Sequence, residues 1–273
     1  MQHRKLCFIG AGNMAGAIIA GLVASGYPAA LISVCAPSTQ RRDRLAEKYG
    51  IHSSSDNIAC ASAAEVVVLA VKPQLMAEVC TDLQKQVNFS DKLVLSIAAG
   101  VSIARFYALL AENLNIVRIM PNTPSLVGKG MSGLYAPAQV NQQDRDYSSQ
   151  LMAAVGKVCW VDSEEGINHV IAAAGSAPAY FFLFMEAMQQ EAQRLGLSAE
   201  NARLLVQQAA SGAAALVEAS PDTPLSQLRE QVTSKGGTTF EALKVFNERE
   251  LSGIVAEAMQ AAITRAQEME KLF

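Results

Sequence analysis

The sequence has little charge of either sign and few aromatic side chains. Charged residues make up 17% of the 273 positions and aromatic residues 6%, whereas 51% are hydrophobic and the mean hydropathy is +0.18. This composition excludes a disordered chain and provides enough apolar surface for one large domain or two ordinary ones. Lysine and arginine number 14 against 11 acidic residues up to Asp162, and 8 against 14 after it. Because neither half carries a basic patch, we expect a small-molecule ligand and no nucleic-acid partner.

Paired cysteines are also absent. The five cysteines stand singly, as Cys7, Cys35, Cys60, Cys80 and Cys159. There is no C-x-x-C pair and the three histidines are equally dispersed, so the spacing predicts neither a zinc site nor a disulfide framework, and no bound metal. Isolated thiols in a chain of this size are typical of a reducing compartment, where each is a small core residue. We therefore expect a cytoplasmic protein.

One uncharged run resembles a signal peptide or a membrane span by hydropathy alone. It extends from Leu6 to Ala24 and follows three basic or histidine residues. Asn13 and four glycines argue against a span. A short apolar run, closely spaced glycines and then an Ala/Ile/Leu pattern are the order of a strand, a tight turn and a helix. We expect no association with a membrane.

Up to Asp162, short apolar runs alternate with helical patterns. The expected strands are Leu6–Ile9, Leu31–Cys35, Val66–Leu69, Leu93–Ser96, Ile116–Met120, Met131–Tyr135 and Lys157–Val161. Val66–Leu69 is apolar without alternation, as in a parallel sheet that helices cover on both faces. The pattern predicts an α/β fold with a doubly wound, Rossmann-like domain over residues 1–162.

Residues 163–273 show no further strand pattern and are rich in Ala, Gln and Glu at helical spacing. We expect an all-α second domain, with Ser198 and Ser252 as helix caps and Gly196 as a helix end. Stretches such as AASGAAALV hold more apolar surface than a domain of this size can bury alone. Packing against the first domain is one explanation; a homodimer through these helices is the one we prefer.

The strongest motif is a G-x-G-x-x-A that follows the first strand and opens a helix. Its residues are Gly10, Ala11, Gly12, Asn13, Met14 and Ala15. Gly10 permits the tight turn, Gly12 leaves the backbone accessible to a pyrophosphate, and Ala15 is small enough for close helix packing. The helix N-terminus faces the phosphates. The motif predicts an NAD(P)-binding domain.

The end of the second strand distinguishes the two dinucleotides. An NAD site usually places an acidic side chain there for the ribose 2′-hydroxyl, but this chain has none. Ser38, Thr39, Arg41 and Arg42 instead offer donors and positive charge to a 2′-phosphate. Singly the arginines are typical of a solvated helix face, so only the combination favours NADPH over NADH.

Further candidate residues follow two buried strands, where open α/β sheets bind their ligands. Ala70, Val71, Lys72 and Pro73 follow one strand, and Ala98 and Ala99 follow the next. Small residues there let a nicotinamide ring lie close to the backbone. Lys72 is a candidate proton donor, although a lysine at a strand end is commonly only solvated.

Six motifs, in this order, cover essentially the whole chain: FIGAGNM, AVKP, SIAAGVS, MPNTP, AGSAPAY and TSKGGTTFEAL. Together they resemble those of the pyrroline-5-carboxylate reductases. The resemblance implies NADPH-dependent reduction of Δ1-pyrroline-5-carboxylate to L-proline, the last step of proline biosynthesis, and an all-α C-terminal dimerisation domain over residues 163–273.

The resemblance also implies residue roles. Gly10–Ala15 would hold the pyrophosphate, Ser38 and Asn57 the adenosine ribose and its phosphate, and Ala70–Pro73 with Ala98 and Ala99 the nicotinamide side. The substrate residues would be Ser234, Gly236, Gly237, Thr238 and Thr239, with Thr239 near the ring nitrogen.

The glycine pair supports a carboxylate site independently of the resemblance. Gly236 and Gly237 free two backbone amides at the start of a helix, which suits one carboxylate without an arginine. Thr238 or Thr239 could instead be only a helix cap. The imine nitrogen can arrive protonated, so we expect Thr239 to orient it and not to donate a proton.

The chain departs from the family pattern at three places. Lys235 stands where the family usually has proline, Ala15 replaces the third glycine, and the spacing around Asp222 differs by about one residue. Two other functions remain open at this stage. A β-hydroxyacid-type dehydrogenase would need a catalytic lysine soon after Gly175, and none follows until Lys235. A non-catalytic NADP-binding regulator is the other.

Overall fold

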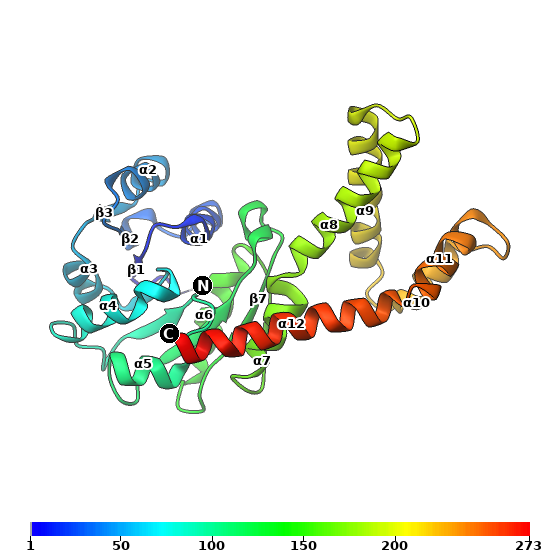
Figure 1. Cartoon of the computed structure of the whole chain (residues 1–273). Coiled ribbons are helices and arrows are strands. Elements are labelled where there is room, and N and C mark those ends of the chain that lie inside the picture. The colour runs from blue at the N-terminus through cyan, green and yellow to red at the C-terminus, as the bar shows by residue number, and fades with distance from the viewer. Residues whose placement is uncertain (1) are drawn as a thin grey trace. The chain divides into compact units, whose positions relative to one another are not determined.

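The computed structural model describes residues 2–273 and divides into two compact units (Figure 1). Unit 1 comprises Met1–Ser176 together with Ala261–Phe273, and unit 2 comprises Ala177–Gln260. We expected the domain boundary after Asp162, whereas the first segment of unit 1 extends to Ser176. The difference arises because the short helix Gly166–Val170 (α7) still packs against the sheet.

Unit 1 contains a single eight-stranded sheet in the order β3-β2-β1-β4-β5-β6-β7-β8. The strands are β1 Leu6–Ile9, β2 Ile32–Cys35, β3 His52–Ser54, β4 Val66–Leu69, β5 Leu93–Ser96, β6 Ile116–Met120, β7 Gly130–Tyr135 and β8 Gly156–Trp160. All pairs are parallel except β6 with β7. The seven expected strands are confirmed within a residue at each end. β3 was not expected, because HSS is short, polar and largely exposed at the sheet edge.

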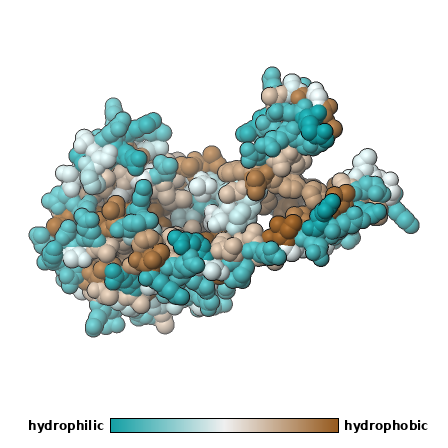
Figure 2. All heavy atoms as spheres, in the orientation of Figure 1, coloured by the Kyte–Doolittle hydropathy of each residue, from teal (hydrophilic) through white to brown (hydrophobic). Residues whose placement is uncertain are grey.

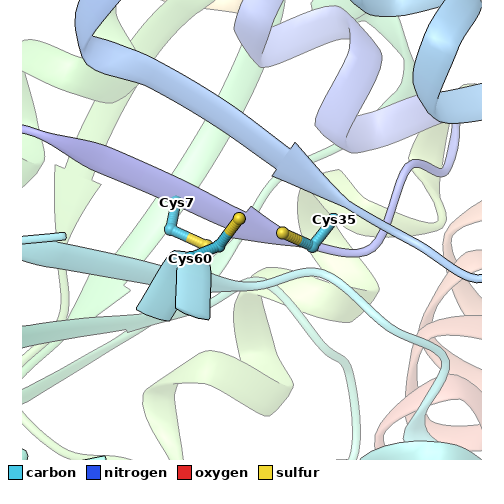
Figure 3. A group of neighbouring side chains, drawn as sticks. All are labelled: Cys7, Cys35 and Cys60. Carbon is cyan, nitrogen blue, oxygen red and sulfur yellow. The ribbon is translucent and has the colours of Figure 1, made fainter. Parts of the chain in front are cut away.

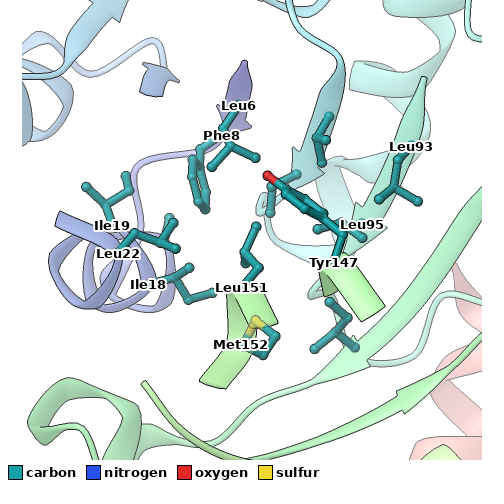
Figure 4. Close-up of a cluster of buried hydrophobic side chains, with 14 of the residues drawn as sticks. Leu6, Phe8, Ile18, Ile19, Leu22, Leu93, Leu95, Tyr147, Leu151 and Met152 are labelled. Atoms are coloured by element: carbon teal, nitrogen blue, oxygen red, sulfur yellow. The ribbon is translucent and has the colours of Figure 1, made fainter. Parts of the chain in front are cut away.

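Helices cover both faces of this sheet, which explains why its central strands are apolar throughout. On β1, Leu6 and Phe8 belong to one buried cluster, and Cys7 and Ile9 belong to the other. The first cluster includes α1 (Asn13–Ala24) and α6 (Gln142–Ala153) (Figure 4). Partly buried side chains of α2 (Thr39–Tyr49) pack beside it. The second includes α3 (Asn57–Ala63), α4 (Pro73–Gln84) and α5 (Ile103–Leu109). The doubly wound fold is confirmed, and Leu6–Ala24 is a strand, a turn and a helix.

The last residues of the chain belong to unit 1 because a buried arginine holds them there. Arg118 on β6 is fully buried, and its Nη1 lies 2.8 Å from Glu164 Oε1. Its Nη2 lies 2.8 Å from Oε1 of Glu270, near the end of α12 (Leu251–Leu272). Arg105 Nε donates to the carbonyl of Phe273 at 2.7 Å. Buried charge is tolerated only when it is paired in this way.

The rest of the described chain after β8 is helical, as the sequence predicts. The helices are α7 Gly166–Val170, a π-helical turn Ile171–Gly175, α8 Ala177–Arg194, α9 Ala199–Ala219, α10 Leu225–Gln231, α11 Thr238–Glu248 and α12 Leu251–Leu272. Gly196, with φ +101°, follows α8 as expected. The expected cap at Ser252 is wrong, because α12 already begins at Leu251 after Glu250, which has a positive φ.

Ser198→Ala is expected to lower the free energy of unfolding by about 1 kcal/mol. Ser198 is the N-cap of α9, and its side chain accepts a hydrogen bond from the Asn201 N–H at 3.2 Å. Thermal unfolding measures the loss. The protein concentration is held fixed, because association between chains also affects the apparent stability. Ser211→Ala, at an exposed position inside the same helix, is the control and should cost nothing. Equal effects of the two changes would contradict the capping role.

Unit 2 exposes many large apolar side chains on its own helices, some of which are visible as brown atoms in Figure 2. Phe181 and Leu183 on α8 are each 68% exposed, and Leu204 on α9 is 61% exposed. Among the described residues, the helical stretch Gly166–Arg194 is long and apolar enough to cross a membrane by length and composition alone. A helix that packs against a second protein has the same composition.

Candidate active site

The turn after β1 requires glycine at its first position. Gly10 has φ +117°, and a Cβ placed there would lie 2.6 Å from the backbone oxygen of Ala70. The Gly10 N–H donates to the Cys35 carbonyl at 2.7 Å, and the Ala70 N–H donates to the Ile9 carbonyl at 2.8 Å. The turn therefore lies against the ends of both neighbouring strands, where the strand order reverses and open sheets bind ligands.

The second glycine opens a cradle at the start of α1. Gly12 is the N-cap of α1, and a Cβ built on it meets no atom within 4 Å. No side chain caps the helix, so its first N–H groups face this open space. Only 1% of Ala15 is exposed, which shows that alanine fits where a third glycine is more usual. Free N–H groups at a helix N-terminus suit a pyrophosphate.

The end of β2 offers hydroxyl groups and a free guanidinium. Ser38 is the N-cap of α2 but its side chain makes no capping hydrogen bond, and Thr39 and Arg41 are exposed. Arg42 is already engaged, because its Nη1 donates to the carbonyls of Ala36 at 2.7 Å and Pro37 at 3.3 Å. Within the described chain Arg41 has no ion pair, so it is the arginine available to a 2′-phosphate.

Asn57 contributes an unpaired polar atom at the start of α3. Asp56 caps this helix by accepting hydrogen bonds from the N–H groups of Ile58 and Ala59, each at 2.9 Å. The Oδ1 atom of Asn57 is buried and has no hydrogen-bond partner among residues 2–273. A buried oxygen without a partner is costly unless a ligand donates to it. Together with the cradle at Gly12, this atom indicates that the site fits a dinucleotide.

The segments after β4 and β5 provide a small-residue surface beside the cradle. Lys72 is the exposed N-cap of α4, and Pro73 is the first residue of that helix. Ala70, Val71 and Ala99 are half-buried, and Ala98 is 6% exposed. The structure thus brings every expected cofactor residue to the carboxyl ends of β1, β2, β4 and β5 or to the start of α3. A proton-donor role for Lys72 stays a prediction.

The expected substrate residues form a tight turn before α11 in unit 2. Gly236 has φ +72°, and a Cβ on Gly237 would lie 2.5 Å from the Oγ of Ser234. Gly237 is the N-cap of α11, with no side-chain cap. Its N–H donates to the Ser234 carbonyl at 2.9 Å, so the expectation of a free amide at Gly237 is wrong, and the uncapped amides begin at Thr238. Thr238 and Thr239 are therefore the first two residues of the helix and not its cap. Both are exposed beside uncapped N–H groups.

The two departures from the family pattern in unit 2, Lys235 and the spacing around Asp222, leave this turn intact. Lys235 is exposed and precedes Gly236, whose positive φ still closes the turn. Asp222 is exposed between α9 and α10 and contacts no expected site residue by a hydrogen bond or ion pair within residues 2–273. The structure gives Asp222 no role in this loop.

Two clusters in unit 1 were missed because their members are distant in sequence. Arg118 meets Glu164 and Glu270 only through the fold, as described above. Cys7, Cys35 and Cys60 bring their sulfur atoms within 4.8 Å of one another. The interpretation of these three as isolated thiols therefore does not hold. No spacing rule detects such a cluster, because its members lie on two strands and a helix.

Comparisons with known proteins match both parts of the chain. The family model described as NADP oxidoreductase coenzyme F420-dependent matches residues 5–100, and that described as pyrroline-5-carboxylate reductase dimerisation matches residues 164–269. Pyrroline-5-carboxylate reductase of Vibrio alginolyticus is 63% identical and covers 100% of both chains. The enzyme structure from Coxiella burnetii has a TM-score of 0.93 at 42% identity, with 98% and 99% coverage. The Plasmodium falciparum structure with NADP bound has a TM-score of 0.87 at 28% identity, covering 99% of each chain.

Proposed function

The chain belongs to the pyrroline-5-carboxylate reductase family, and we propose that it reduces Δ1-pyrroline-5-carboxylate to L-proline with NADPH, the last step of proline biosynthesis. The observation that carries the proposal is the uncapped start of α11 behind Gly236 and Gly237. Dinucleotide binding alone does not require a second site for a carboxylate in the helical part of the chain. The matched full-length relatives support the same function.

The cofactor is held mainly by backbone groups. The N–H groups at the start of α1 bind the pyrophosphate over Gly12, where no side chain intervenes. Asn57 Oδ1 accepts from the adenosine ribose, and Ser38, Thr39 and Arg41 bind its 2′-phosphate. Ala70–Pro73 with Ala98 and Ala99 leave room for the nicotinamide. When bound, NADPH supplies the hydride.

The substrate is held by the turn before α11. The N–H groups of Thr238 and the following residues bind its carboxylate, aided by the Ser234 and Thr238 hydroxyls. Thr239 orients the ring nitrogen, which arrives protonated. Orientation and exclusion of water are then the main tasks of the protein, and no strong general acid is required.

Steady-state oxidation of NADPH with pyrroline-5-carboxylate, followed by its near-ultraviolet absorbance, tests the proposed function. Rapid oxidation with NADPH preferred over NADH is the expected result. A folded protein that binds NADPH but oxidises neither cofactor would favour the non-catalytic regulator. Turnover with a β-hydroxyacid in place of the imine would favour the other alternative.

Arg41→Ala is expected to raise the KM for NADPH about 10-fold and to leave the KM for NADH unchanged. The exposed guanidinium of Arg41 contributes a charge-assisted contact to the 2′-phosphate alone. Arg44→Ala, at an exposed position of the same helix, is the matched control and should change neither constant. An equal rise for both cofactors would assign Arg41 to the shared part of the dinucleotide.

The C-terminal domain, proposed as residues 163–273, also joins copies of the chain. The exposed apolar side chains of α8 and α9 support a homodimer or higher oligomer through these helices. Light scattering coupled to size exclusion measures the mass, and a monomer at micromolar concentration would contradict this assembly. All five cysteines are free thiols, which supports a cytoplasmic location.

A further inference from the structure

Three cysteine side chains converge in unit 1 outside the proposed site. Cys7 lies on β1, Cys35 is the last residue of β2, and Cys60 lies on α3 (Figure 3). Their sulfur atoms all lie within 4.8 Å of one another. Cys7 and Cys35 are buried, and Cys60 is half-buried. The two strands pair in parallel, and α3 covers them, so the backbone fixes all three positions.

Hydrogen bonding ties the cluster to the start of α3. Cys35 Sγ donates to the carbonyl of Asp56, the N-cap residue of that helix, at 3.7 Å. The cluster therefore joins the end of β2 to the helix that carries Cys60. Thiolate is the form of cysteine that binds metals, so each thiol gives up its proton when a metal ion enters.

A surface hollow leads to the cluster at Cys60. Cys60, Ala59, Ser33 and His52 are among the residues that line it. Cys60 is therefore the point at which a small ion reaches the two buried sulfurs. Metal sites require such an entry path in addition to a suitable ligand set.

We propose that Cys7, Cys35 and Cys60 form a three-thiolate site for one soft d10 cation of the Cu(I) class. Metal–sulfur bonds of about 2.3 Å in a trigonal plane place the sulfurs about 4 Å apart, a small contraction of the observed cluster. Soft thiolate ligands select such ions. Zinc prefers four ligands, and within residues 2–273 no further Cys, His, Asp or Glu atom joins the group. Binding releases the thiol protons as the ion takes their place.

Anaerobic titration of the reduced full-length protein with Cu(I), in competition with a chromogenic chelator, tests the site. One equivalent should bind with a near-ultraviolet thiolate charge-transfer band. Cys60→Ser should weaken binding at least about 100-fold, because it removes one of three ligands. Cys159→Ser, a half-buried thiol on β8, is the matched control and should bind as the parent does. Unchanged binding in Cys60→Ser would overturn the proposal.

A second measurement does not depend on the variant. In the unmodified protein, bound Cu(I) should protect Cys60 from alkylation, as read by peptide mass spectrometry, and should leave Cys159 reactive. Alkylation of Cys60 at the same rate with and without the ion would also overturn the proposal. Tighter binding of Zn(II) than of Cu(I) would contradict the three-coordinate assignment.

Discussion

Gly12→Val is expected to raise the KM for NADPH about 1,000-fold and to change the free energy of unfolding by less than about 1 kcal/mol. A Cβ at this position meets no protein atom within 4 Å, so we expect the fold to accept valine. The backbone angles of Gly12, φ −76° and ψ 177°, are also ordinary for valine. The new methyl groups occupy the space of the pyrophosphate, and losing two charge-assisted hydrogen bonds costs roughly 3–6 kcal/mol.

Gly10→Ala is the contrasting control in the same turn. Its Cβ would lie 2.6 Å from the Ala70 carbonyl at a φ of +117°, so the protein should lose roughly 2–5 kcal/mol of stability before any cofactor is added. Thermal unfolding and NADPH titration of both variants separate the two roles. If Gly12→Val lost stability and kept its NADPH affinity, the cradle would be structural and the cofactor assignment at this turn would be wrong.

The sequence predicts this turn well because its determinants are local. A glycine with positive φ, a small N-cap and an apolar strand and helix act within a dozen residues, and Leu6–Ile9 has the predicted bounds. β3 lacks such determinants, since His52–Ser54 is a short polar strand at the edge of the sheet. It forms a strand because it pairs with β2. Local chemistry likewise predicted the turn at Gly236, but not the start of α12.

Features that depend on distant contacts could not be predicted from spacing. In the sequence Arg118 is a single charged residue within an apolar strand. Only the fold brings Glu164 and Glu270 to its guanidinium. The return of the end of α12 to unit 1 follows from that pairing. The convergence of Cys7 and Cys35 depends on the register of β1 with β2, which a hydropathy pattern does not fix.

Thr239→Ala is expected to lower kcat/KM for pyrroline-5-carboxylate roughly 100-fold and to leave the KM for NADPH unchanged. Thr239 is exposed in the first turn of α11, so its removal should not affect folding. A hydrogen bond to a charged group contributes roughly 1.5–3 kcal/mol, which corresponds to a loss of about 10-fold to 150-fold. Because the hydroxyl orients the ring nitrogen without supplying its proton, the pH profile of kcat/KM should keep its shape.

Two variants distinguish orientation from other roles of this side chain. Thr239→Ser keeps the hydroxyl and should retain most of the activity, whereas Thr239→Val keeps the shape and should behave as Thr239→Ala does. Full activity in Thr239→Ala would remove Thr239 from the site. A change in the pH profile with that variant would instead make the hydroxyl part of a proton path, and the imine would then not need to arrive protonated.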